Sequence, residues 1–208
     1  MPCKRVERIC EVLQDTIKDT RSELNYINEY TFLVAVVLSA QTTDKQVNSV
    51  TGRLFALVQT PQAMLELGEG KLCELIKSTG FYKNKAKHVI QLSEKLICDF
   101  GGQVPQTRVE LMSLPGVGPK TANVILNQLF KQPTIAVDTH VFRVSRRLGL
   151  SSGKSPKDVE SDLEKCIPNE YKAHIGDQLL LHGRYTCTAR KPKCETCKLK
   201  EFCKDYIA

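Results

Sequence analysis

Long hydrophobic runs are scarce in this sequence. The most apolar stretch is Phe32–Ala40, far shorter than the ~20 residues that a membrane-spanning helix needs. The first residues, Met-Pro-Cys-Lys-Arg-Val-Glu, have no apolar segment behind their charges, and a secretory signal requires one. We therefore expect no membrane association and a protein that works in a reducing cytoplasm.

Strand signals, repeats and low-complexity segments are also missing. Only Thr134–Val137 has a strand-like composition, and it is too short to build a sheet. Helix signals fill the rest of the chain: Phe32–Ala40 predicts a buried helix. Helix starts are predicted at Thr60-Pro61, at Thr107–Glu110 and at Ser155–Asp158. The pattern predicts a globular, all-α protein.

The charges are unbalanced towards Lys and Arg. The chain has 30 basic and 23 acidic residues, a formal net charge of +7. Such an excess favours a polyanionic partner, because each contact with a phosphate releases condensed counterions. It is equally compatible with a basic protein that binds no nucleic acid.

Nine cysteines in a reducing compartment do not indicate disulfides. Four of them, Cys187, Cys194, Cys197 and Cys203, follow the spacing C-x6-C-x2-C-x5-C and can close on one metal centre. Four thiolates suit structural zinc or an iron–sulfur cluster, and the spacing leaves both open. The other five, expected to be small core or surface residues, are Cys3, Cys10, Cys73, Cys98 and Cys166.

A basic loop separates the first two of these clustered cysteines. It contains Arg190, Lys191 and Lys193. Their cationic side chains can contact DNA phosphates, or they can offset the negative charge of a thiolate cluster. The two interpretations are compatible, and both remain open.

The segment Leu114–Asn123 reads L-P-G-V-G-P-K-T-A-N. A helix is expected to end near Ser113, Gly116 and Gly118 allow a tight turn, and a new helix begins at Pro119. Glycines ahead of a helix N-terminus let backbone N–H groups approach a phosphate closely. The segment therefore predicts a helix–hairpin–helix that binds the DNA backbone.

Two charged residues near helix starts are candidates for chemistry. Lys120 lies in a first helical turn, where the macrodipole disfavours a cation, so it is either a reactive free amine or a phosphate contact. Asp138 is expected to cap the helix that begins at Thr139, and capping is compatible with catalysis. His140 either contacts DNA or packs structurally.

These segments together resemble bacterial endonuclease III over nearly the whole chain. The resemblance is carried by Leu38–Asp44, Leu114–Leu126, Pro133–Val144, Leu181–Cys187 and the spacing of the last four cysteines. It implies an all-α fold of two helical domains with a DNA-binding cleft between them. Residues 22–132 would form a six-helix domain, and residues 1–21 with 133–208 the iron–sulfur cluster domain.

The resemblance also implies an activity and a cofactor. The protein would be a monomeric, bifunctional glycosylase and AP lyase that binds double-stranded DNA containing damaged pyrimidines or abasic sites. Lys120 would form a Schiff base, Asp138 would assist, and the strand would be cut 3′ to the abasic site by β-elimination. The four clustered cysteines would hold a [4Fe–4S] cluster, and the protein would be bacterial, cytoplasmic and associated with the nucleoid through DNA.

Two positions depart from the family pattern. Pro119 stands where a basic residue is common, which removes one possible phosphate contact. Phe81 stands where an aliphatic wedge is usual, although an aromatic ring can also fill the gap left by a flipped nucleotide. Gln41 and Phe81 are the residues expected to fill that gap.

Three rival interpretations remain. A monofunctional adenine glycosylase of the same superfamily would lack the lysine that this chain has at Lys120. A non-catalytic, redox-sensing DNA-binding protein would leave the pair Lys120 and Asp138 unexplained. A zinc-dependent structural module would be colourless when purified.

Overall fold

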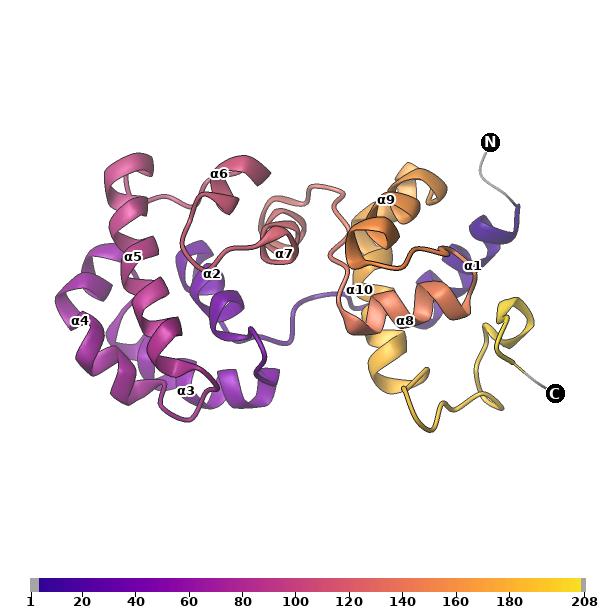
Figure 1. Ribbon diagram of the computed structural model, residues 1–208, viewed down its shortest axis with the longest axis horizontal. Helices are drawn as coiled ribbons and strands as arrows, with labels where there is room; N and C mark the ends of the chain where they lie inside the picture. Colours follow the sequence, from indigo (N-terminus) through magenta and orange to yellow (C-terminus); the bar gives the residue numbers. More distant parts are fainter. Residues whose placement is uncertain (1–3, 207–208) are drawn as a thin grey trace. The chain divides into compact units, whose positions relative to one another are not determined.

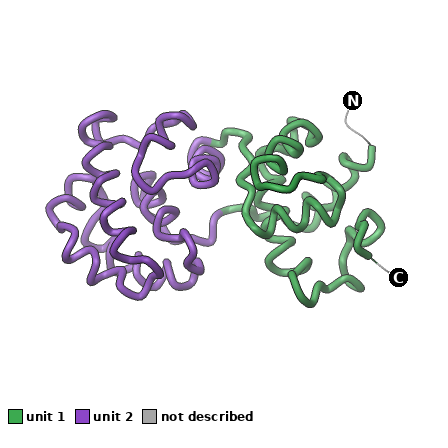
Figure 2. The backbone as a smooth tube through the Cα atoms, in the orientation of Figure 1, with its two compact units in different colours: residues 1–21, 131–208 green, residues 22–130 purple. Residues whose placement is uncertain are grey.

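The computed structural model describes residues 4–206, and all regular structure in that part is helical (Figure 1). The backbone divides into two compact units (Figure 2). We call residues 22–130 the hairpin unit, and residues 1–21 with 131–208 the cysteine unit. Each unit has a hydrophobic core of its own. The predicted all-α fold is confirmed.

The hairpin unit is built around one buried helix, α2, which contacts α3, α5 and α7. Every residue from Tyr30 to Leu38 is buried, so α2 has no polar face, as predicted for Phe32–Ala40. The helix ends at Leu38, and Ala40 lies exposed in the following turn. The helices of the unit are α2 Glu29–Leu38, α3 Asp44–Leu57, α4 Pro61–Leu75, α5 Tyr82–Phe100, α6 Arg108–Met112 and α7 Pro119–Phe130.

In the cysteine unit, α10 packs against both α1 and α8. A Cβ added at Gly183 of α10 would lie 2.9 Å from the Cβ of His140 and 3.0 Å from a methyl of Val144. Only glycine therefore permits this close approach of α10 to α8. The helices of the unit are α1 Lys4–Thr16, α8 Thr139–Arg147, α9 Pro156–Cys166, α10 Asn169–Tyr185 and the 3-10 helix η1 Lys200–Phe202.

The three predicted helix starts are confirmed. Thr60 caps α4 directly ahead of its proline, and Ser155 forms a reciprocal capping box with Asp158 in α9. Thr107 caps α6 by accepting a bond from the backbone N–H of Glu110 at 3.3 Å. Its hydroxyl also donates to the Glu110 carboxylate at 2.6 Å, so the two side chains bond directly to each other.

The segment Thr134–Val137 has a strand-like composition but a different structure. Thr134–Val137 forms no strand, and none occurs anywhere between residues 4 and 206. Ile135 and Val137 are instead buried in the core of the cysteine unit, which accounts for their apolar character. Helix α7 ends at Phe130 because Lys131 adopts a left-handed conformation with φ 55°, ahead of Pro133.

The scattered cysteines are ordinary structural residues. Cys10 is fully buried, and burial raises the pKa of its thiol to about 12. Cys98 is exposed, Cys73 and Cys166 are half-buried, and Cys3 lies outside the described residues. Over the described range 4–206, no helix has the length and apolar character needed to cross a membrane.

Candidate functional site

The predicted hairpin joins α6 to α7. Gly116 adopts φ 81°, and a Cβ there would lie 3.1 Å from the Cβ of His88, so both conformation and space require glycine. Val117 N–H donates to Leu114 O at 3.1 Å and closes the turn. Gly118 does not have a positive φ, and a Cβ there would meet nothing within 4 Å. The turn therefore needs unusual backbone angles at one of the two glycines.

Lys120 is the second residue of α7, directly after Pro119. Its side chain is exposed, while Ala122, Ile125 and Leu126 on the other face of the helix are buried in the hairpin unit. A helix that is buried on one face therefore presents this lysine to solvent. The structure places it at the start of the helix, as the sequence predicts.

Asp138 caps α8 in the cysteine unit. Its Oδ1 atom accepts bonds from the backbone N–H groups of His140 and Val141, both at 2.8 Å. These bonds satisfy two of the donors that a helix start leaves unpaired. The predicted cap is confirmed, and the half-buried carboxylate is held in one orientation.

His140 is fixed by a neighbour on the same helix. The guanidinium of Arg143 lies 3.2 Å from His140 Nδ1, and a guanidinium can only donate. Nδ1 therefore accepts, which leaves the proton of the neutral ring on Nε2. Arg143 also donates to Gly183 O at 2.8 Å and to Cys187 O at 3.0 Å. The histidine is thus part of the packing between α8 and α10, and its contact with DNA stays a prediction.

Gln41 and Phe81 share an unusual conformation in the hairpin unit. Their φ angles are 53° and 56°, and together with Lys131 they are the non-glycine residues with positive φ between residues 4 and 206. Both are exposed, Phe81 to 68%. A Cβ at Gly80 would lie 3.6 Å from Gln41 O, so the two turns adjoin. Left-handed residues cost about 1–2 kcal/mol each, and such strain clusters at functional sites.

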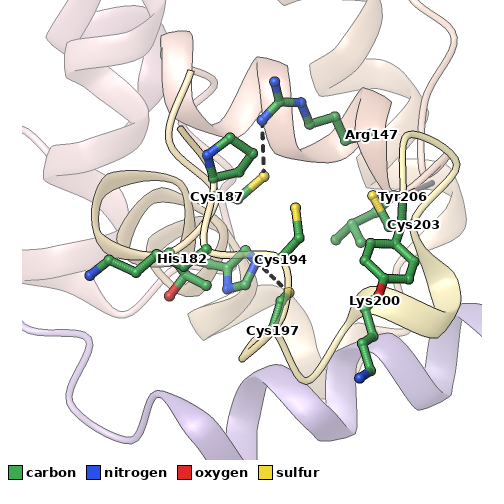
Figure 3. Close-up of a pocket in the computed structure, with 12 residues that line it drawn as sticks. Arg147, His182, Cys187, Cys194, Cys197, Lys200, Cys203 and Tyr206 are labelled. Atoms are coloured by element: carbon green, nitrogen blue, oxygen red, sulfur yellow. Dashed lines mark hydrogen bonds between the residues drawn. The ribbon is translucent and has the colours of Figure 1, made fainter. Parts of the chain in front are cut away.

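The four clustered cysteines line one cavity after α10. Figure 3 shows their sulfur atoms around a common space, with Arg147 and His182 beside them. The donor set consists of thiols from the loop and from the end of η1. Between residues 4 and 206, no three His, Cys, Asp or Glu side chains converge on a site for a single ion. Four thiols around a shared space fit a cluster that takes one thiolate at each iron.

Two side chains that sequence reasoning missed touch these thiols (Figure 3). Arg147 donates to Cys187 Sγ at 3.3 Å and to Thr188 O at 2.9 Å, and the bond to the thiol raises the pKa of this arginine. His182 Nε2 lies 3.7 Å from Cys197 Sγ, and burial lowers the pKa of His182 to about 4. No spacing rule points to either residue, because both reach the loop from helices.

The predicted basic loop is exposed and internally braced. Arg190, Lys191 and Lys193 are all exposed. Thr188 Oγ1 donates to Lys191 O at 2.7 Å, and Lys193 N–H donates to Thr186 O at 2.9 Å. The three cationic side chains therefore project from a loop whose backbone is held in place.

Comparison with known proteins identifies the family. Residues 34–169 match the HhH-GPD superfamily of base excision DNA repair proteins, and residues 187–203 match the iron–sulfur binding domain of endonuclease III. The chain is 51% identical to endonuclease III of Treponema pallidum over 200 residues, which is 96% of this chain and 95% of that protein. It is 45% identical to the Escherichia coli K12 enzyme, over 96% and 94%. The chain belongs to the endonuclease III family.

Solved structures of endonuclease III agree with this assignment. The structure of a trapped endonuclease III–DNA covalent intermediate matches with a TM-score of 0.91 and 43% identity, over 98% of this chain and 97% of that one. A non-covalent endonuclease III–DNA complex matches with the same TM-score at 42% identity. The chain is therefore a DNA-binding enzyme of base excision repair, a DNA glycosylase and AP lyase.

Membership of the endonuclease III family also decides the cofactor. The cysteine segment matches an iron–sulfur binding domain, so the protein carries a [4Fe–4S] cluster and the zinc alternative is set aside. The predicted cofactor is confirmed.

Proposed function

We propose that the protein excises oxidised pyrimidines from duplex DNA through a Schiff base at Lys120 and then cuts the strand 3′ to the abasic site. The observation that carries the proposal is the exposed lysine at the second position of α7, directly after the hairpin. A relative 43% identical to this chain has been captured as a covalent intermediate with DNA. An exposed amine on a packed helix beside a backbone-binding hairpin suits such an attack.

DNA is bound through its phosphates on both units. In the hairpin unit, the exposed glycines Gly116 and Gly118 donate backbone N–H groups to one phosphate. In the cysteine unit, Arg190, Lys191 and Lys193 contact phosphates from their braced loop, and the Nε2–H of His140 adds a neutral donor. The net charge of +7 supports this electrostatic mode. The protein acts as a monomer in the bacterial cytoplasm, held at the nucleoid by DNA.

The damaged nucleotide must leave the stack, because its C1′ atom is inaccessible inside a duplex. Gln41 and Phe81 fill the vacated space, the ring by stacking on a neighbouring base. Their exposure and their left-handed backbones support this role. An oxidised pyrimidine that stacks poorly costs less to extrude, which favours damaged over intact bases.

Glycosylase chemistry begins at the amine. The lone pair of Lys120 Nζ forms a bond with C1′ while the C1′–N1 bond breaks, and its electron pair leaves with the base, which gains a proton. Positive charge develops on the sugar in the transition state. The carboxylate of Asp138 stabilises that charge and assists proton transfer. The bonds from the backbone of α8 hold the Asp138 carboxylate in one orientation before substrate binds.

Strand cleavage follows from the same covalent bond. Opening of the sugar ring converts the adduct into a Schiff base, which acidifies the proton at C2′. Loss of that proton sends an electron pair into a C2′–C3′ double bond and expels the 3′ phosphate oxygen. Water then hydrolyses the imine and frees Lys120.

Within the cysteine unit, Asp138 supplies chemistry, and the loop that follows α10 supports DNA binding. Cys187, Cys194, Cys197 and Cys203 hold the cluster, whose role is structural: it fixes the basic loop. We assign residues 22–132 and residues 1–21 with 133–208 to two domains. The two compact units support that division, with the boundary between residues 130 and 131.

A nicking assay tests the function. Duplexes carrying an abasic site, thymine glycol or 8-oxoguanine are incubated with the protein, and the strands are separated under denaturing conditions. We expect cleavage at the abasic site and at the oxidised pyrimidine, with little at the oxidised purine. Binding without any cleavage would support the rival interpretation of a non-catalytic, redox-sensing protein.

A further inference from the structure

Lys85, in the first turn of α5, is a buried lysine. It is 5% exposed, whereas Lys83 and Lys87 of the same helix are exposed. Burial lowers the pKa of Lys85. Removing an ammonium group from water costs free energy that an apolar side chain of the same length would not cost. A lysine at this position therefore needs an explanation other than stability.

The Lys85 amine reaches out of its own helix to the turn after α2. Its Nζ donates to Thr42 Oγ1 at 2.6 Å, a short bond between groups 43 residues apart. The Thr42 hydroxyl in turn donates to Ala40 O at 3.4 Å, and Thr42 N–H donates to Ser39 O at 3.1 Å. The amine thus bonds to a turn that is itself held by its own backbone, directly beside Gln41.

Lys85 also bonds to the turn that contains Gly80 and Phe81. Its backbone N–H donates to Phe81 O at 3.1 Å, which is the first backbone bond of α5 and does not depend on the side chain. Lys85 therefore bonds to Phe81 itself and to the residue that follows Gln41. The Gln46 side chain, in the first turn of α3, donates to Ser78 O and so links α3 to the segment before Phe81.

We propose that Lys85 is a positioning residue that fixes Gln41 and Phe81 relative to each other for insertion into the duplex. The inference rests on the proposed role of these two side chains in filling the vacated space. Both residues have a strained left-handed backbone, and each is more free to leave that conformation when the two turns are not joined. A tether formed before DNA binds removes the ordering cost from the insertion step, which therefore proceeds faster.

A duplex with a tetrahydrofuran abasic analogue opposite 2-aminopurine reports insertion as a rise in fluorescence. Lys85→Met and Thr42→Val should each slow that rise about tenfold, the factor expected for a hydrogen bond to a charged group. Thr42→Ser keeps the hydroxyl and should retain the wild-type rate. Lys87→Met removes an exposed charge from the same helix, so it controls for lost attraction to DNA.

A double-mutant cycle separates the tether from other effects. The variant with both Lys85→Met and Thr42→Val should be no slower than either single variant, because both substitutions break one bond. Affinity for undamaged duplex should match that of Lys87→Met, since the tether acts at insertion. Thermal unfolding checks the folding of each variant; if Lys85→Met is unfolded, the comparison of Thr42→Val with Thr42→Ser decides.

Phe81→Ala and Gln41→Ala keep the inference distinct from the proposed function. If these variants slow the fluorescence rise while Lys85→Met and Thr42→Val match the wild type, the positioning role is wrong and the inserted residues stand. If Lys85→Met is slow but Thr42→Val is not, the tether is overturned. If Phe81→Ala and Gln41→Ala both insert at the wild-type rate, the proposed role of these two residues is wrong.

Discussion

The two units each present a charged residue at the start of a helix, but the charges have opposite signs. Asp138 is the N-cap of α8, where two backbone N–H groups donate to it at 2.8 Å. Lys120 is the second residue of α7, where the helix macrodipole disfavours a cation. Stability alone explains the aspartate at its position. It does not explain the lysine, so the lysine is the more direct indicator of function.

The cores of the two units differ as well. The hairpin unit surrounds α2 with apolar side chains on every face. In the cysteine unit, the described segment 186–206 has a single buried hydrophobic residue, Leu199. The segment that follows α10 therefore has little apolar core of its own, and we expect the cluster to order it.

The largest effect is expected for the aspartate of the cysteine unit. Asp138→Asn keeps an oxygen that accepts from His140 and Val141, so we expect little change in stability. The loss of negative charge should lower the single-turnover rate of base excision by about 10²–10⁴-fold. DNA affinity should be unchanged. Excision at the wild-type rate would show that Asp138 is a cap and nothing more.

The next effect concerns the cofactor. Cys194→Ser should abolish the visible absorbance of the iron–sulfur cluster and weaken the cysteine unit by on the order of 4 kcal/mol, the stabilisation from a ligand present at a thousand times its Kd. Amide exchange should rise around the cysteine loop and stay slow in α2. Cys98→Ser, at an exposed position, is the control. Faster exchange throughout α2 would contradict the difference between the two cores.

A smaller effect is expected in the hairpin. Gly116→Ala forces a Cβ into a left-handed residue and against His88, which should destabilise the protein by about 1–2 kcal/mol. DNA affinity should fall with the distortion of the turn. Gly118→Ala is the matched change, since its Cβ would meet nothing and its φ is not positive. Equal losses of stability, measured by chemical denaturation, would contradict this distinction.

The smallest effect is expected at a helix cap outside the proposed site. Ser155→Ala removes the bond that the Ser155 hydroxyl accepts from Asp158 N–H, and should cost about 1 kcal/mol. Thr60→Ala is the equivalent change in the hairpin unit. Both variants should excise bases at the wild-type rate at temperatures where they are folded. A loss of activity without a loss of stability would show that the cap has a second role.

Local signals made much of the fold predictable. The caps at Thr60 and Ser155, the start of α7 at Pro119 and the cap at Asp138 follow from residues within one turn of each other. The buried helix α2 follows from a continuous apolar run. Thr134–Val137 misleads because apolar residues in an extended connection have the same composition as a strand.

Contacts between distant segments could not be predicted. Nothing in the spacing of Lys83, Lys85 and Lys87 indicates which one is buried, since that depends on how α5 meets the turn after α2. Arg147 of α8 and His182 of α10 contact cysteines 40 and 15 residues further along the chain, so no motif records them. The four cysteines were predictable because their own chemistry brings them together.

Borohydride trapping on abasic duplex tests the central claim most directly, because the reductant converts a Schiff base into a stable covalent bond. We expect the wild-type protein and Lys87→Ala, a control at an exposed lysine, to give a trapped complex that survives denaturation. Lys120→Ala should give none while still binding the duplex. A trapped band of wild-type strength from Lys120→Ala would show that another amine is the nucleophile.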